Sequence, residues 1–138
     1  MKLVDLVIPV YDGYDETVAC VESVLASIDQ AWVRVVIIND GSPNPEITEY
    51  LRSKARQSPQ IELLENSENL GFVATVNIGM GHDRTRDVVL LNSDVEVAGD
   101  WLQRLREAAY RHDNVASVTP FSNNATVCSF PDICENNE

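Results

Sequence analysis

Polar and acidic residues follow three of the apolar runs of this chain. Tyr11-Asp12 comes after the first run, Asn39-Asp40-Gly41-Ser42 after the second, and Asn92-Ser93-Asp94 after the fourth. A carboxylate at the mouth of a buried strand is held by rigid backbone, so Asp94 can offer oxygen to a hard cation at a fixed place. Mg²⁺ or Mn²⁺ bound through one protein carboxylate completes its shell with waters and substrate phosphates. The segment therefore indicates a metal-diphosphate site, although the same residues also commonly form a simple turn.

Asp40 and the segment Pro9-Val10-Tyr11 could together bind a flat nucleobase. An ionised carboxylate accepts hydrogen bonds, and the imide N–H of uracil is a donor that needs such an acceptor. The tyrosine ring could stack or pack over the other side of the base. The alternatives stay open, because Asp-Gly is a common turn and a single tyrosine is more often part of a core or its rim.

Gly71 lies in the segment Glu68-Asn69-Leu70-Gly71-Phe72, between the third apolar run and the helical pattern that follows it. A glycine here permits an unusual backbone angle or a close approach to phosphate, beside the free N–H groups of a helix N-terminus. A simple turn is the alternative.

The residues that position these segments alternate between two periods. Apolar, β-branched runs typical of strands occupy five ranges: 3–10, 33–38, 61–64, 88–91 and 115–118. Helical spacing predicts four helices, which begin near Asp15, at Pro45, at Phe72 and after Gly99-Asp100. For the second of these, Asn44 is the expected N-cap and Pro45 takes the first helical position. This alternation predicts an α/β fold with a parallel sheet of about five strands and helices on both faces. In such sheets the carboxyl ends of the strands line the binding crevice, which would gather the three acidic segments.

Composition restricts the classes of partner. The chain has 138 residues, so one domain is expected. Its formal net charge of −12 should repel nucleic acid and anionic lipid surfaces. No apolar run approaches the roughly 20 residues of a membrane span, and the start resembles no secretory signal. The three cysteines lack paired zinc spacing. We expect a cytoplasmic protein with reduced cysteines and no membrane-spanning segment.

Taken together, the motifs resemble the nucleotide-sugar-binding half of an inverting family-2 glycosyltransferase with the GT-A fold, a Rossmann-like architecture. The resemblance covers residues 3 to about 127. The matching segments, in the order of the family, are VDLVIPVYDG, VVIINDGS, ENLGFVATVNIGM, VVLLNSDVEVAGDWLQRL and VTPFSNNAT.

The resemblance implies roles for individual residues. Pro9-Val10-Tyr11 would border the nucleobase, and Asp40 would contact it. Asn92-Ser93-Asp94 stands where the family has its D-x-D motif, so Asp94 would meet the Mg²⁺ or Mn²⁺ on the diphosphate. Asn92 replaces the first aspartate of the motif and brings no second charge.

The same resemblance sets expectations for the domains and the reaction. Residues 1–120 would form the nucleotide-sugar-binding domain, and residues 121–138 a loop or tail that starts a missing acceptor-binding half. The donor would be a nucleotide diphosphate sugar, with a UDP-linked donor as the first candidate. The acceptor would be a saccharide hydroxyl, in cell-surface polysaccharide synthesis, with the chain inactive alone. The catalytic base stays unassigned, because the acidic residues after the fifth predicted strand lie in an unpatterned segment.

Two other classes of protein compete with this interpretation. One is a non-catalytic nucleotide-binding or self-associating module with the same fold, which could form a homo-oligomer through an exposed sheet edge. The other is a phosphoryl-accepting receiver-like domain. That chemistry needs an aspartate after the third strand and a later lysine, whereas Glu65-Asn66 follows that strand and the lysines are Lys2 and Lys54.

Overall fold

A four-stranded parallel sheet forms the centre of the protein. The computed structural model describes residues 3–123 and residue 128. The strands are β1 (Val4–Val10), β2 (Val33–Asn39), β3 (Ile61–Glu65) and β4 (Asp87–Leu90), in the order β3-β2-β1-β4. β1 pairs with β2 from Val4↔Val33 to Val10↔Asn39, so both lie inside the sheet and are buried along nearly their whole length. The first four predicted strands are confirmed to within a residue or two.

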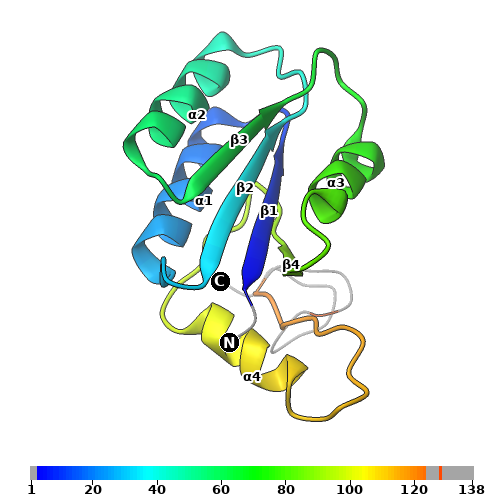
Figure 1. Cartoon of the computed structure of the whole chain (residues 1–138). Helices are drawn as coiled ribbons and strands as arrows, with labels where there is room; N and C mark the ends of the chain where they lie inside the picture. The colour runs from blue at the N-terminus through cyan, green and yellow to red at the C-terminus, as the bar shows by residue number, and fades with distance from the viewer. Residues whose placement is uncertain (1–2, 124–127, 129–138) are drawn as a thin grey trace. The chain divides into compact units, whose positions relative to one another are not determined.

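Helices cover both faces of this sheet, as Figure 1 shows: α1 (Tyr14–Ser27) and α2 (Pro45–Gln57) lie on one face and α3 (Phe72–Gly81) on the other. The predicted cap of α2 is confirmed, since the Asn44 side chain accepts a hydrogen bond from Glu46 N at 2.9 Å. In α3, a Cβ added at Gly79 would overlap the side chains of Val7 and Ile38. The absence of a side chain at this position therefore lets α3 approach the sheet closely.

The predicted fifth strand is wrong. Residues 115–118 form no strand, and among them Val115 and Val118 are only half-buried while Ala116 and Ser117 are exposed. A β-branched run forms a strand when a neighbour pairs with it and buries it, and local propensity alone does not supply that neighbour. In the described residues the sheet ends at β4.

The chain divides into two compact units, Met1–Ala98 and Gly99–Glu138. The boundary falls inside the segment 1–120 that the sequence assigns to one domain. The second unit contains α4 (Trp101–Ala109), which follows Gly99-Asp100 as predicted. Most of the predicted tail, 121–138, lies outside the described residues. No helix among the described residues combines the length and apolar character needed to cross a membrane.

A buried carboxylate organises the amino edge of the sheet. Asp5 is fully buried on β1; Arg34 Nη2 donates to its Oδ2 at 2.6 Å, and Arg86 Nε lies 2.5 Å from its Oδ1. Arg34 also contacts the carboxylates of Glu62 at 3.2 Å and Asp83 at 3.4 Å. This network lies at the end of the sheet opposite to the acidic loops.

Candidate functional site

The carboxyl ends of the strands bring the predicted segments to one edge of the sheet. β1 lies between β2 and β4, and all three strands run parallel. Tyr11 follows β1, Asp40 follows β2, and Asp94 lies four residues beyond the end of β4. Neighbouring strands are about 5 Å apart, so β2 and β4, on either side of β1, lie about 10 Å apart across the sheet. β4 ends opposite Val7, and β2 ends further along, opposite Val10. The predicted convergence of three loops at one edge is confirmed.

Asp40 has a structural task at this edge. Its side chain is 4% exposed, and its carboxylate accepts three hydrogen bonds from the segment between β3 and α3. Oδ1 accepts from Asn66 Nδ2 at 2.8 Å and from Leu70 N at 2.9 Å, while Oδ2 accepts from Gly71 N at 3.0 Å. Asp40 therefore joins the end of β2 to the loop that precedes α3.

The environment of Asp40 favours its ionised form. Burial alone would raise the pKa of this carboxyl, but hydrogen bonds from Leu70 N, Asn66, Thr75 and Gly71 N outweigh burial and lower the pKa below its usual value. The carboxylate is nearly buried and is already engaged by these donors, so little of it is accessible to a ligand. The predicted contact between Asp40 and a base stays a prediction.

Two glycines fit the backbone around Asp40 for different reasons. Gly41 has a φ of 62°, and a Cβ there would lie 2.5 Å from the carbonyl carbon of Glu68. Gly71 has a φ of 82° but open space where a Cβ would stand. The Gly71 N–H donates to Asp40 and to Asn69 Oδ1, so it is not free to bind a phosphate. Gly71 thus serves the loop conformation, and its predicted place beside a phosphate stays untested.

Asp94 lies in a tight turn after β4. Val95 N donates to Asn92 O at 3.3 Å, which places Ser93 and Asp94 at the two central positions of the turn. Asp94 is exposed, as Asn92 is, and Ser93 is half-buried. Within the described part of the chain the Asp94 carboxylate has no hydrogen bond or ion pair. An accessible, unpaired carboxylate suits a hard divalent cation.

The site offers a cation few protein ligands. In the residues that the structure describes, no three side chains of His, Cys, Asp or Glu are grouped so that they could hold a metal ion. A cation bound at Asp94 would therefore need further oxygen atoms from water and from a substrate, as the sequence predicts for a diphosphate.

The segment Pro9-Val10-Tyr11 is placed less uniformly than its sequence suggests. The Val10 side chain is 1% exposed, so a contact with a base could come only from its backbone, and its carbonyl already accepts from Asp40 N at 2.8 Å. Pro9 is half-buried. The Tyr11 ring is 44% exposed and is the part of this segment that is free to pack against a ligand.

The sequence did not indicate the residues that form hydrogen bonds to these loops from neighbouring elements. Asn66 bonds Asp40, while on α1 the Cys20 thiol donates to Asn92 O and the Ser23 hydroxyl accepts from Val97 N. Asn66 directly follows β3, as Asp40 directly follows β2, and that position was an available signal. The contacts of Cys20 and Ser23 span more than 70 residues of sequence, and no local pattern indicates them.

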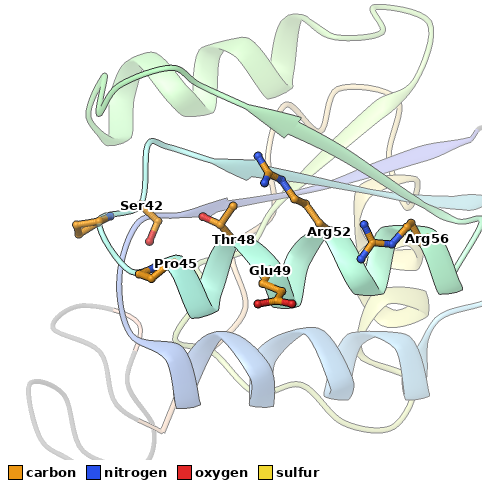
Figure 2. A pocket seen from close by; sticks show the side chains of 7 residues that line it. Ser42, Pro45, Thr48, Glu49, Arg52 and Arg56 are labelled. Atoms are coloured by element: carbon orange, nitrogen blue, oxygen red, sulfur yellow. The ribbon is translucent and has the colours of Figure 1, made fainter.

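A groove of about 560 Å³ opens beside this edge, along α2 (Figure 2). It begins at Ser42, just after β2, and runs past Thr48 and Arg52 to Arg56. Arg52 is paired with Glu65 at 3.0 Å. None of the predicted site residues lines this groove, so it is distinct from the edge described above.

Comparisons with known proteins find a family match and several longer relatives. The pattern of the family described as "Glycosyl transferase family 2" matches residues 5–128. The succinoglycan biosynthesis protein ExoO of Rhizobium meliloti is 33% identical over 106 residues, which are 77% of this chain and 29% of that protein. The curated relatives that the chain matches are much longer, and it spans 12–32% of their lengths.

Two solved structures share the fold. GalNAc-T7, solved with UDP, GalNAc and Mn²⁺, superposes with a TM-score of 0.67 at 20% identity, over 75% of this chain and 20% of that one. The mannosyltransferase PcManGT of Pyrobaculum calidifontis, solved with GDP-Man and Mn²⁺, gives 0.64 at 18% identity, over 72% of this chain and 29% of that one. The likeness confirms the predicted Rossmann-like α/β class, with four strands in place of five.

Proposed function

The chain belongs to glycosyl transferase family 2, and from this premise we propose that it binds the nucleotide-sugar donor of a glycosyl transfer reaction. The observation that carries the proposal is the edge formed by three parallel strands, where an exposed Asp94, unpaired among the described residues, shares the carboxyl edge of the sheet with Tyr11 and the loop held by Asp40. The two fold neighbours were solved with a nucleotide or nucleotide sugar and Mn²⁺, which supports this use of the edge.

Each residue at the edge has a proposed task. Asp94 holds the divalent cation, Mg²⁺ or Mn²⁺, and Asn92 offers an amide to a ribose or sugar hydroxyl. The Tyr11 ring packs against the base, and Asp40 accepts a hydrogen bond from it. When bound, the cation stabilises the negative charge of the departing diphosphate.

The finer parts of the proposal concern the rest of the reaction. The acceptor is a saccharide hydroxyl that displaces the diphosphate directly, with inversion, in the synthesis of a cell-surface polysaccharide; the likeness to ExoO supports this setting. No described residue is assigned as the base that deprotonates the acceptor. We therefore propose that this chain supplies donor binding and does not turn over alone.

Isothermal titration calorimetry with UDP and GDP, each with and without Mn²⁺, tests donor binding. We expect UDP to bind in the presence of Mn²⁺, and the substitution Asp94→Ala to weaken that binding by at least about tenfold, because the cation loses its protein ligand. Asp29→Ala is the matched control, since Asp29 is an exposed aspartate at the amino edge of the sheet. Tighter binding of GDP than of UDP would show that the donor carries guanine in place of uracil. Unchanged binding of UDP with Mn²⁺ in Asp94→Ala would refute the metal site.

A second candidate function is that of a non-catalytic, self-associating module. β4 lies at the edge of the described sheet, and Leu90 at its end is 42% exposed. An unpaired strand edge with apolar residues favours pairing with a second copy. Light scattering distinguishes the candidates: a dimer that binds no nucleotide supports the module, whereas a monomer that binds UDP with Mn²⁺ excludes it.

A further inference from the structure

Helix α1 contacts the loop after β4 at two points. The Cys20 thiol, fully buried, donates to Asn92 O at 3.5 Å. The Ser23 hydroxyl accepts from Val97 N at 3.1 Å and itself donates to Cys20 O at 2.8 Å. Residues three apart on a helix share a face, so both contacts come from one turn of α1.

The two contacts fall at the two ends of a short segment. Residues 92–97 leave the sheet after Leu91 N, which donates to Val7 O at 3.0 Å. Asn92 O accepts from the Cys20 thiol and also closes the turn that carries Asp94, through Val95 N. Ser23 holds the far end of the segment, at Val97. One rigid helix thus fixes both ends of six residues whose centre bears the accessible carboxylate.

We infer that this turn of α1 positions the cation-binding loop, with Cys20 and Ser23 as positioning residues for Asp94. The inference rests on the proposed donor site and adds the means by which its one protein carboxylate is held in place. Neither side chain touches the cation or the nucleotide. Both act on the backbone that carries Asp94.

A lone carboxylate needs such support. When several protein ligands surround a cation, they restrain one another, but here one carboxylate must meet the cation at a fixed distance from the bound diphosphate. Each loop residue that becomes ordered on binding costs conformational entropy. Hydrogen bonds that order residues 92–97 in the free protein remove part of that cost before the ligand arrives.

The chemistry of Cys20 suits a permanent donor. Burial raises the pKa of its thiol to about 11; Val95 N–H acts in the opposite direction, and the charges of Asp94 and Glu96 raise the pKa further. The thiol therefore keeps its proton at neutral pH and can donate to Asn92 O throughout the physiological range.

The test compares Ser23→Ala with Ser23→Thr, which keeps a hydroxyl at the same place. Ser53→Ala is the matched control, because Ser53 lies on α2 and its hydroxyl, among the described residues, accepts from Gln57 Nε2 alone. Hydrogen exchange of the Val97 amide is measured without ligand, and UDP affinity is measured with and without Mn²⁺. We expect Ser23→Ala to speed Val97 exchange several-fold and to weaken Mn²⁺-dependent UDP binding by roughly three- to tenfold. UDP binding without Mn²⁺ should not change, and Ser23→Thr and Ser53→Ala should resemble the wild type.

Cys20→Ala provides a second variant, checked for folding by its thermal unfolding curve. Like Ser23→Ala, it should weaken the binding of UDP in the presence of Mn²⁺ and leave the binding of UDP without Mn²⁺ unchanged. If the Val97 amide of Ser23→Ala exchanges as slowly as in the wild type, α1 does not anchor the loop. If the wild type binds UDP with Mn²⁺ and the variants bind it with the same affinity, Cys20 and Ser23 do not position Asp94. If the wild type binds no nucleotide with Mn²⁺, the proposed function fails and with it the positioning role, while Val97 exchange still decides whether α1 anchors the loop.

Discussion

At the scale of single residues, Asp40 is where the fold and the candidate site depend on the same side chain. The substitution Asp40→Asn keeps one acceptor oxygen for Asn66 and Leu70 N, but it turns an NH₂ group toward the N–H of Gly71. A buried donor then faces another donor, and we expect a loss of about 1–3 kcal/mol in the free energy of unfolding at pH 7. Urea unfolding measures it. Asp12→Asn is the control, because Asp12 is exposed and, within the part of the chain that the structure describes, accepts from Gly13 N alone. Its effect should stay within about 0.5 kcal/mol.

The same substitution has a defined dependence on pH. The pKa of Asp40 is lower in the folded protein than in the unfolded chain, so its ionised form contributes stability above the unfolded value of about 3.9. That contribution disappears as the pH falls through the lower, folded value. The stability difference between the wild type and Asp40→Asn should therefore be full at pH 7 and shrink below about pH 4. A difference that stays constant down to the acid transition would contradict the hydrogen-bonded, ionised state.

The sequence predicts which residues lie at the carboxyl edge of the sheet better than it predicts what each of them does there. Asp40 and Asp94 were both expected at the carboxyl ends of strands, and both are there. Their environments could not be expected, because Asp40 is buried by a loop some 30 residues further along, whereas Asp94 has no partner within the described residues. Cys20 shows the same limit, since its acceptor lies 72 residues away. Distant contacts decide whether a carboxylate binds a ligand or a loop.

At the scale of elements, the close approach of α3 to the sheet can be tested with two glycines of one helix. Gly79→Ala places a Cβ against Val7 and Ile38, while Gly81→Ala meets open space. We expect Gly79→Ala to cost about 1–3 kcal/mol through overpacking. Gly81→Ala should be neutral or stabilising by up to about 1 kcal/mol, because alanine favours the helix. Thermal unfolding of both variants gives the comparison, and equal effects would show that α3 does not pack as closely as the structure indicates.

Periodicity predicts helices and strands well where the apolar pattern of a segment is clear and cap residues or neighbouring strands support it. The starts of α2 and α3 and the run of β2 combine cap residues, helical spacing or continuous β-branched residues, and the structure has them at the expected places. Residues 115–118 carry a similar apolar signal and form no strand. A parallel strand exists only beside another strand, so its local pattern is necessary but not sufficient.

At the scale of the whole molecule, the sheet separates stability at one end from the candidate chemistry at the other. The ion network around Asp5 lies at the amino edge, and the loops that carry Tyr11, Asp40 and Asp94 lie at the carboxyl edge. The net charge of −12 adds repulsion that a bound divalent cation would reduce. A change in the network should therefore alter the free energy of unfolding without altering ligand affinity in the folded state.

Asp5→Asn tests this separation. The hydrogen bond from Arg34 to Asp5 is the main reason that the pKa of Arg34 is raised, and both Arg34 and Arg86 lose their shared carboxylate when Asp5 becomes an amide. Breaking a buried pair by removing one partner costs about 3–5 kcal/mol, so we expect a loss near that size in urea unfolding. Glu62→Gln is the control: Glu62 is 39% exposed in the same network, and its loss should cost at most about 1 kcal/mol. Well below the unfolding transition, Asp5→Asn should bind UDP with Mn²⁺ as the wild type does. A weaker affinity in the folded variant would show that the two edges of the sheet are coupled.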